Sequence, residues 1–169
     1  LLFRQEKIYG TRHHMQLPRN TMARWIEQIA DSLKLIYLCM ADQLLAGDYL
    51  QIDETPIRYL QPGSGKAQQG YFWAYSNPKG DALFDWQTGR SHDCLLEMLT
   101  KPNESKEGPA RIHLFQGYVQ CDGYIAYKTL ANKVSGIHLA GCWAHVRRKF
   151  KDALRHAPKQ ASWFIRQIQ

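Results

Sequence analysis

The sequence of 169 residues has no apolar run that approaches the ~20 residues needed to cross a lipid bilayer. Its most hydrophobic stretch, residues 33–45, is interrupted by Lys34 and Asp42. The first residues also lack the charged start and apolar centre of a secretory signal peptide. With 44% hydrophobic and 22% charged residues, the composition is typical of a soluble globular protein. We therefore expect a cytoplasmic protein rather than a membrane or secreted one.

Closely spaced cysteine pairs are also missing. The four cysteines, Cys39, Cys94, Cys121 and Cys142, form no CxxC motif, and we expect reduced, buried thiols. One spacing suits a metal, because Cys142 and His145 are three positions apart and share a helix face. Structural zinc takes four ligands and this pair supplies two. Packing and local hydrogen bonding are the favoured interpretation, and a zinc-stabilised interaction module remains an alternative.

Acidic residues are scarce near the C-terminus. Residues 1–140 contain 15 basic and 14 acidic residues, whereas residues 141–169 contain seven basic residues and one acid, Asp152. A basic block of this kind indicates a polyanionic partner, although a solvated helix face is the alternative. The residues predicted to contact the phosphates of DNA are Arg147, Arg148, Lys151 and Arg155.

The periodicity of apolar residues changes along the chain. Residues 3–46 have helical spacing, with a faint helix-turn-helix signal at 17–26, although a packing helix is favoured there. Strands are predicted at 48–54, 55–60, 70–76, 82–87, 118–122 and 136–140, and helices at 91–100, 124–131 and 143–157, the last ended by Pro158. A stripe on this last helix is predicted to pack in the core: Trp143, Val146, Phe150 and Leu154.

This order is a meander of three strands followed by helical crossovers. It predicts an α/β fold with a mixed five-stranded sheet flanked by helices, preceded by an N-terminal helical segment. The same order of elements is found in the ribonuclease H-like fold.

Two acidic residues follow apolar strand runs. Asp53 closes the run YLQID, and Asp122 closes YVQCD directly before a glycine and a helix. Two carboxylates at the ends of neighbouring strands repel each other unless divalent cations lie between them, as in two-metal phosphoryl transfer. The alternative is that each aspartate caps a turn. Glu54 follows Asp53, so strand alternation directs it to the other face, and it is a secondary candidate.

Five segments carry a resemblance to a known family. They are FRQEKIYG, LPRNTMARWIEQIA, QIDETPIRYL, VQCDGYIAYKTL and GCWAHVRRKFKDAL, in this order along nearly the whole chain. In sequence and spacing they resemble the central part of transposases of the insertion-sequence-66 family. The DETP element is short and moderately specific, whereas CWAHVRRKF is more so.

The resemblance implies a ribonuclease H-like catalytic core with an Asp-Asp-Glu triad and two Mg²⁺ ions, for which Mn²⁺ would substitute. Asp53 matches the first acid and Asp122 the second. The third, a glutamate, belongs to a motif later than Gln169, so we expect a fragment that is inactive or nearly so alone. Alternatives are a non-enzymatic DNA-binding fragment and a ribonuclease H-like nuclease with Asp152 as third acid.

The resemblance also implies an organisation and partners. Residues 1–47 are expected to be a helical segment leading into the core, 48–141 the first part of the core, and 142–169 the start of a basic helical insertion. The expected partners are double-stranded DNA, at transposon ends and target, and further copies of the protein in a synaptic complex. The protein would be associated with the nucleoid when it is bound to DNA.

Overall fold

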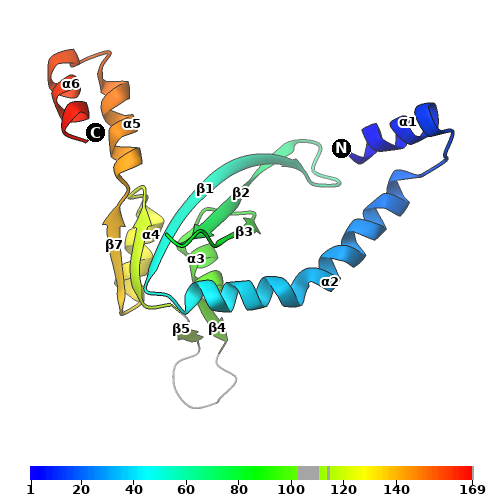
Figure 1. Ribbon diagram of the computed structural model, residues 1–169, viewed down its shortest axis with the longest axis horizontal. Helices are drawn as coiled ribbons and strands as arrows, with labels where there is room; N and C mark the ends of the chain where they lie inside the picture. Colours follow the sequence, from blue (N-terminus) through cyan, green and yellow to red (C-terminus); the bar gives the residue numbers. More distant parts are fainter. Residues whose placement is uncertain (103–110, 114, 169) are drawn as a thin grey trace. The chain divides into compact units, whose positions relative to one another are not determined.

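The computed structural model describes residues 1–102, 111–113 and 115–168, and the chain divides into two compact units, Leu1–Ala41 and Asp42–Gln169 (Figure 1). The polar run PNESKEGPA, residues 102–110, for which a loop is expected from its composition, lies almost wholly outside the described residues. Among the helices that the structure describes, none is long and apolar enough to span a membrane.

The first unit consists of α1 (Leu2–His13) and most of α2 (Arg19–Leu45). The predicted helical segment is thus correct in extent but interrupted after His13, where His14 adopts the left-handed conformation with φ 54°. The two helices are joined by the backbone N–H of Arg19, which donates to Glu6 Oε1 at 3.1 Å. Most of the apolar stripe of α2 is exposed in the described structure, including Trp25, Ile26, Ile29, Leu33 and Ile36.

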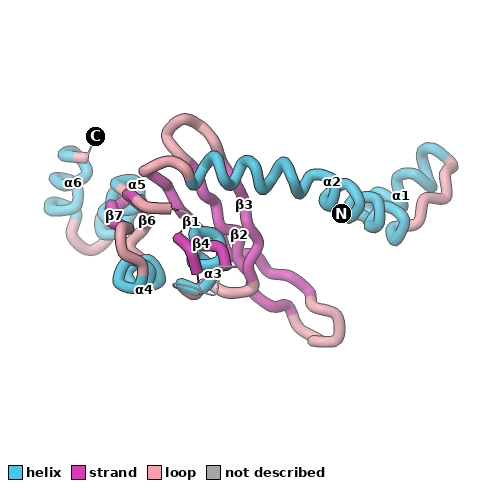
Figure 2. The backbone as a smooth tube through the Cα atoms, turned by 90° about the horizontal axis from the view of Figure 1, so that it is seen from below, coloured by secondary structure: helices cyan, strands magenta, loops and turns pink. Residues whose placement is uncertain are grey.

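The second unit is built on a five-stranded sheet in the order β3-β2-β1-β6-β7. Its strands are β1 (Tyr49–Leu60), β2 (Ala67–Ser76), β3 (Ala82–Gln87), β6 (Gly117–Cys121) and β7 (Ile137–Gly141). The first three form an antiparallel meander, and β6 and β7 are parallel to β1 (Figures 1 and 2). The crossovers are α3 (His92–Leu99) and α4 (Ile125–Lys133). The mixed α/β fold class is therefore confirmed.

A small antiparallel pair, β4 (Thr100–Pro102) and β5 (Arg111–His113), was not predicted. The two predicted runs at 48–54 and 55–60 are one continuous strand, because Pro56 interrupts neither its pairing with β2 nor its direction.

The two faces of the sheet differ in burial. In β1, Leu50, Ile52 and Glu54 are buried, whereas Gln51 and Asp53 between them are exposed. The buried face packs against α4, as shown by the edge-to-face contact of Trp73 with Tyr127, whose ring centroids are 6.2 Å apart. Other fully buried side chains of the core come from the sheet and from the helices α3 and α4: Tyr75, Val119, Leu95, Leu99 and Leu130. The acid Asp53 therefore lies on the face opposite the core.

Gly117 sets the register between β1 and β6. Its φ is +146°, and a Cβ there would lie 2.1 Å from the carbonyl oxygen of Asp48. This close approach lets the N–H of Tyr118 donate to the same oxygen at 2.8 Å. From that contact the strands pair in parallel, as far as Gln51 opposite Gln120.

The C-terminal helices differ from the prediction in two ways. The helix α5 (Trp143–Ala153) ends earlier than expected, and Pro158 begins α6 (Pro158–Gln167) instead of ending α5. Proline suits this position because the first turn of a helix leaves its N–H groups unpaired in any case. The predicted core stripe was also wrong: no residue of α5 is buried, and Trp143 is 65% exposed. Phe150 instead stacks on Phe164 of α6 at 4.5 Å.

All four cysteines are free. Cys94 and Cys121 are buried as expected, whereas Cys142 is half-buried. Cys39 is exposed, which corrects the prediction, because it lies on α2 where the described residues provide no covering layer.

Candidate functional site at the β1–β6 edge

Asp53 lies in β1, and Asp122 directly follows β6, the parallel neighbour of β1. The last paired residues of β1 and β6 are Gln51 and Gln120, and each acid stands two positions further along its strand direction. The side-chain amides of the two glutamines are joined by a hydrogen bond of 2.8 Å from Gln51 Nε2 to Gln120 Oε1. The strands end differently, however. β6 ends directly before Asp122, whereas β1 continues past Asp53 to Leu60 and is paired with β2 along that length. The prediction that Asp53 ends a strand was therefore wrong.

Asp53 points toward the C-terminal helices. Its side chain is 59% exposed, and its Oδ2 lies 3.9 Å from His145 Nε2. Its Oδ1 accepts the N–H of Glu54 at 3.0 Å. The second ring nitrogen of His145, Nδ1, is buried and has no hydrogen-bond partner among the described residues. Asp53 and His145 line a pocket of about 220 Å³ together with Gln120, Cys121 and Cys142.

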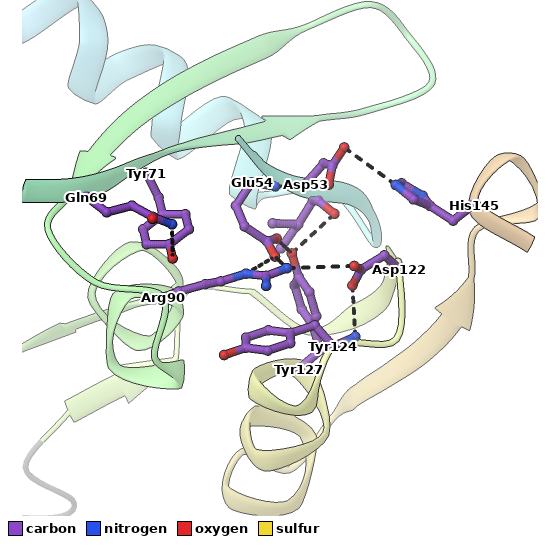
Figure 3. A network of polar contacts seen from close by, with 10 residues as sticks. Asp53, Glu54, Gln69, Tyr71, Arg90, Asp122, Tyr124, Tyr127 and His145 are labelled. Carbon is purple, nitrogen blue, oxygen red and sulfur yellow. Dashed lines mark hydrogen bonds and ion pairs between the residues drawn. The ribbon is translucent and has the colours of Figure 1, made fainter. Parts of the chain in front are cut away.

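Asp122 is fixed at one carboxylate oxygen and lies near a cation at the other. Oδ1 accepts the backbone N–H of Tyr124 at 2.8 Å, in the turn through Gly123 that leads into α4. Oδ2 lies 3.8 Å from Nη2 of Arg90. Figure 3 shows that Asp53 is turned toward His145 while Asp122 is turned toward Arg90. The structure thus brings the two strand segments together and gives each acid a different neighbour, His145 for Asp53 and Arg90 for Asp122.

Glu54 is the buried centre of the polar network in Figure 3. Its side chain is 1% exposed. Arg90 donates to Oε1 through Nε at 2.6 Å and through Nη2, and the Tyr127 hydroxyl donates to Oε2 at 2.5 Å. Glu54 faces away from Asp53, as strand alternation predicted, and its surroundings are those of a buried ion pair.

Two pKa shifts follow from this burial. The pKa of Tyr127 is raised far above its usual value by burial and by the hydrogen bond to the Glu54 carboxylate, so its hydroxyl keeps its proton. Burial opposes the charge of Arg90, but the hydrogen bond and charge of Glu54 outweigh it and raise the pKa of the guanidinium. The network therefore consists of a carboxylate, a permanent cation and a permanent hydroxyl donor.

Sequence reasoning missed Arg90 and Tyr127, which lie 36 and 73 positions from Glu54. The available signal was the inward position of Glu54 on β1. A carboxylate buried in a sheet face needs a cationic partner, and that requirement directs attention to basic residues at the ends of the covering helices.

The two aspartates have the ligand atoms that a hard divalent cation prefers, because both supply carboxylate oxygens. Both side chains also reach solvent, and that of Asp122 is 26% exposed. Within the described residues, no group of three or more His, Cys, Asp and Glu side chains is arranged to hold a metal ion. The carboxylates of Asp53 and Asp122 are therefore chemically compatible with such a cation, but the described residues do not form a complete metal site.

The weaker candidates fall into two places. Asp152 is exposed on α5 and joins no such group with the two acids among the described residues. Cys142 is at the N-cap of α5, and His145 lies in its first turn, so both line the pocket beside Asp53. Together Cys142 and His145 would supply two of the four ligands that structural zinc takes.

The predicted DNA-contacting residues lie on and just after α5. Arg148, Lys151 and Arg155 are exposed, and Arg147 is half-buried. In the described part of the chain, no ion pair joins any of the four to an acidic side chain. Their positive charge is therefore uncompensated locally.

The fold and site define an α/β protein with two acids at the junction of neighbouring parallel strands. The chain matches the model of the transposase IS66 family over residues 2–169, and it belongs to that family. The recognised resemblance is thereby confirmed.

Two curated relatives come from Sinorhizobium fredii. The uncharacterized protein y4qI is 33% identical, with 89% of this chain and 28% of that protein covered. The uncharacterized protein y4jD is 32% identical, with 91% of this chain and 30% of that protein covered. The chain therefore spans less than a third of the length of these relatives. No solved structure matches it.

Proposed function

We propose that residues 48–141 form the first part of a ribonuclease H-like catalytic core, of the kind that cleaves DNA at transposon ends and joins it to target DNA, and that residues 142–169 begin a basic helical insertion. The observation that carries this proposal is the parallel pairing of β1 with β6, which puts Asp53 and Asp122 at one junction of the sheet. Membership of a transposase family supports the reaction class.

Asp53 and Asp122 would act as the first and second acids and supply carboxylate oxygens to Mg²⁺, for which Mn²⁺ substitutes. Cations held there would supply activation of the attacking oxygen and stabilisation of the leaving oxygen of the phosphodiester. The chain's own groups orient the acids: the N–H of Tyr124 fixes one oxygen of Asp122, and the N–H of Glu54 fixes one oxygen of Asp53.

The proposed catalytic triad requires a third carboxylate, and we assign it to a residue that is not among these 169. No third metal-binding side chain joins Asp53 and Asp122 among the described residues, and this favours an external glutamate over Asp152. With two of three acids, the chain alone would bind cations weakly and cleave DNA slowly or not at all.

The partner would be double-stranded DNA, contacted through the phosphates by the uncompensated basic residues on and after α5. A synaptic complex of several copies would bring two transposon ends together. The protein would act in the cytoplasm, where it would associate with the nucleoid.

A transposition assay tests the proposed acids when it is performed in cells that carry the complete coding frame containing these residues. Asp53→Asn and Asp122→Asn should each lower the transposition frequency by about 10³-fold or more, because each removes a cation ligand at constant volume. Asp152→Asn is the matched control and should stay within about twofold of the unchanged protein. A loss with Asp152→Asn as large as with Asp122→Asn would instead identify Asp152 as the third acid.

A further inference from the structure

Arg90 lies between two carboxylates of unequal burial. Its Nη2 donates to Oε1 of Glu54, whose side chain is 1% exposed, and lies 3.8 Å from Oδ2 of Asp122, whose side chain is 26% exposed. One face of the guanidinium covers the ring of Tyr124, with 3.8 Å from Cζ to the ring centroid. Arg90 is thus bound to one acid and only near the other.

The difference between these two contacts is chemical. A separation of 3.8 Å is too long for a hydrogen bond, whose heavy-atom distance ends near ~3.2 Å, so Arg90 attracts Asp122 without donating to it. Oδ2 of Asp122 therefore keeps its lone pairs available. A closed, bidentate arginine–carboxylate pair at Asp122 would occupy the oxygens that a cation needs.

Glu54 holds Arg90 in this position. It accepts two N–H groups of the guanidinium on one oxygen, while the Tyr127 hydroxyl occupies the other oxygen at 2.5 Å. Because a buried carboxylate without a cation is strongly unfavourable, Arg90 is held more firmly by Glu54 than by the more exposed Asp122.

We propose that Glu54 restrains Arg90 so that Asp122 stays free to bind a divalent cation, which makes Glu54 and Arg90 a pair of positioning residues. The inference rests on the proposed function, in which Asp122 is a cation ligand. The pair as a whole is neutral, so its effect on the site arises from where it places the guanidinium rather than from added charge.

Binding of Mn²⁺ to the chain, followed by the electron paramagnetic resonance signal of the free ion, separates the roles of the pair. In Glu54→Gln, Arg90 loses its anionic partner and is expected to close on Asp122, which should weaken Mn²⁺ binding about tenfold. In the double variant Glu54→Gln/Arg90→Gln no competing cation remains, and the affinity should return to within about twofold of the unchanged chain. Arg90→Gln alone should bind Mn²⁺ at least as tightly as the unchanged chain.

Tyr127→Phe is the matched control, because it removes another donor to Glu54 without freeing Arg90, and it should leave Mn²⁺ binding unchanged. A pair that merely supports the fold would behave differently: Glu54→Gln and the double variant would be equally weak, or neither would change. Either result overturns the inference. If Glu54→Gln does not fold, as judged by circular dichroism, weaker binding in Arg90→Gln overturns it instead.

A metal-free measurement distinguishes failure of the inference from failure of the proposed function. The Nε–H signal of Arg90 in a nitrogen-15 correlation spectrum should respond little to Asp122→Asn in the unchanged chain and strongly in the Glu54→Gln background. Equal responses in both backgrounds would overturn the restraint. If Asp53→Asn and Asp122→Asn leave Mn²⁺ binding intact while the Arg90 signal behaves as expected, the restraint exists and the catalytic assignment is wrong.

Discussion

Asp53 and Glu54 are adjacent in sequence and have opposite environments. Strand alternation places Asp53 on the open face with 59% of its side chain exposed and Glu54 in the core with 1% exposed. A one-residue shift in the register of β1 would exchange them, bury Asp53 and expose the partner of Arg90. The register of β1 against β6 is therefore a condition for both the proposed ligand role and the buried ion pair.

That register depends on Gly117, and we predict that Gly117→Ala lowers the free energy of unfolding by about 3 kcal/mol. The new Cβ would meet the Asp48 carbonyl oxygen at 2.1 Å, and the φ of +146° disfavours any side chain. Urea unfolding measures the change. Gly80→Ala is the control, because its φ is also positive, +101°, but nothing lies within 4 Å, so it should lose only about 1 kcal/mol. Equal losses would show that steric contact at Asp48 is unimportant.

At the scale of elements, α5 carries basic residues that face no described acid. We predict that Arg148→Ala/Lys151→Ala reduces the slope of log affinity against log salt concentration by about 1.8 for duplex DNA, because each lost phosphate contact removes about 0.9. Fluorescence anisotropy between about 50 and 200 mM salt measures this slope.

The control for this prediction is Lys66→Ala/Lys79→Ala, which removes the same charge from the two hairpin turns of the meander. Its slope should stay close to that of the unchanged chain. Equal changes in both variants would mean that total charge, rather than α5, determines DNA binding.

The order of elements was predictable because strand and helix periods are local properties. The parallel pairing that brings Asp53 and Asp122 together followed from that order. Three features did not follow. Trp143 lies on a helical stripe that is apolar by pattern but exposed, since periodicity does not reveal whether a partner surface exists. Pro158 begins α6, whereas the preceding helix has already ended at Ala153. Arg90 reaches Glu54 only through the tertiary fold, across 36 positions.

At the scale of the whole molecule, the buried network is expected to make the free energy of unfolding decrease at alkaline pH. Burial and the Glu54 hydrogen bond raise the pKa of Tyr127 above its ordinary value of 10.0, so the folded chain keeps a proton that the unfolded chain releases. The resulting stabilisation is complete below pH ~10 and decreases above it by about 1.4 kcal/mol per pH unit. Burial likewise raises the pKa of the Cys121 thiol from 9.0, which adds a decrease of the same sign beginning about one pH unit lower.

We predict that Tyr127→Phe removes the larger part of this alkaline loss above pH ~10 while lowering stability near neutral pH by about 1–2 kcal/mol, the effect of leaving the buried Glu54 oxygen without its donor. Urea midpoints measured from pH ~8 to ~11 give both quantities for the unchanged chain and for the variant. Cys121→Ala is the companion variant and should flatten only the earlier part of the decline, near pH ~9. If the Tyr127→Phe chain loses stability with the same slope as the unchanged chain above pH ~10, the hydroxyl is not the group that titrates, and Glu54 is not held by a permanently protonated donor.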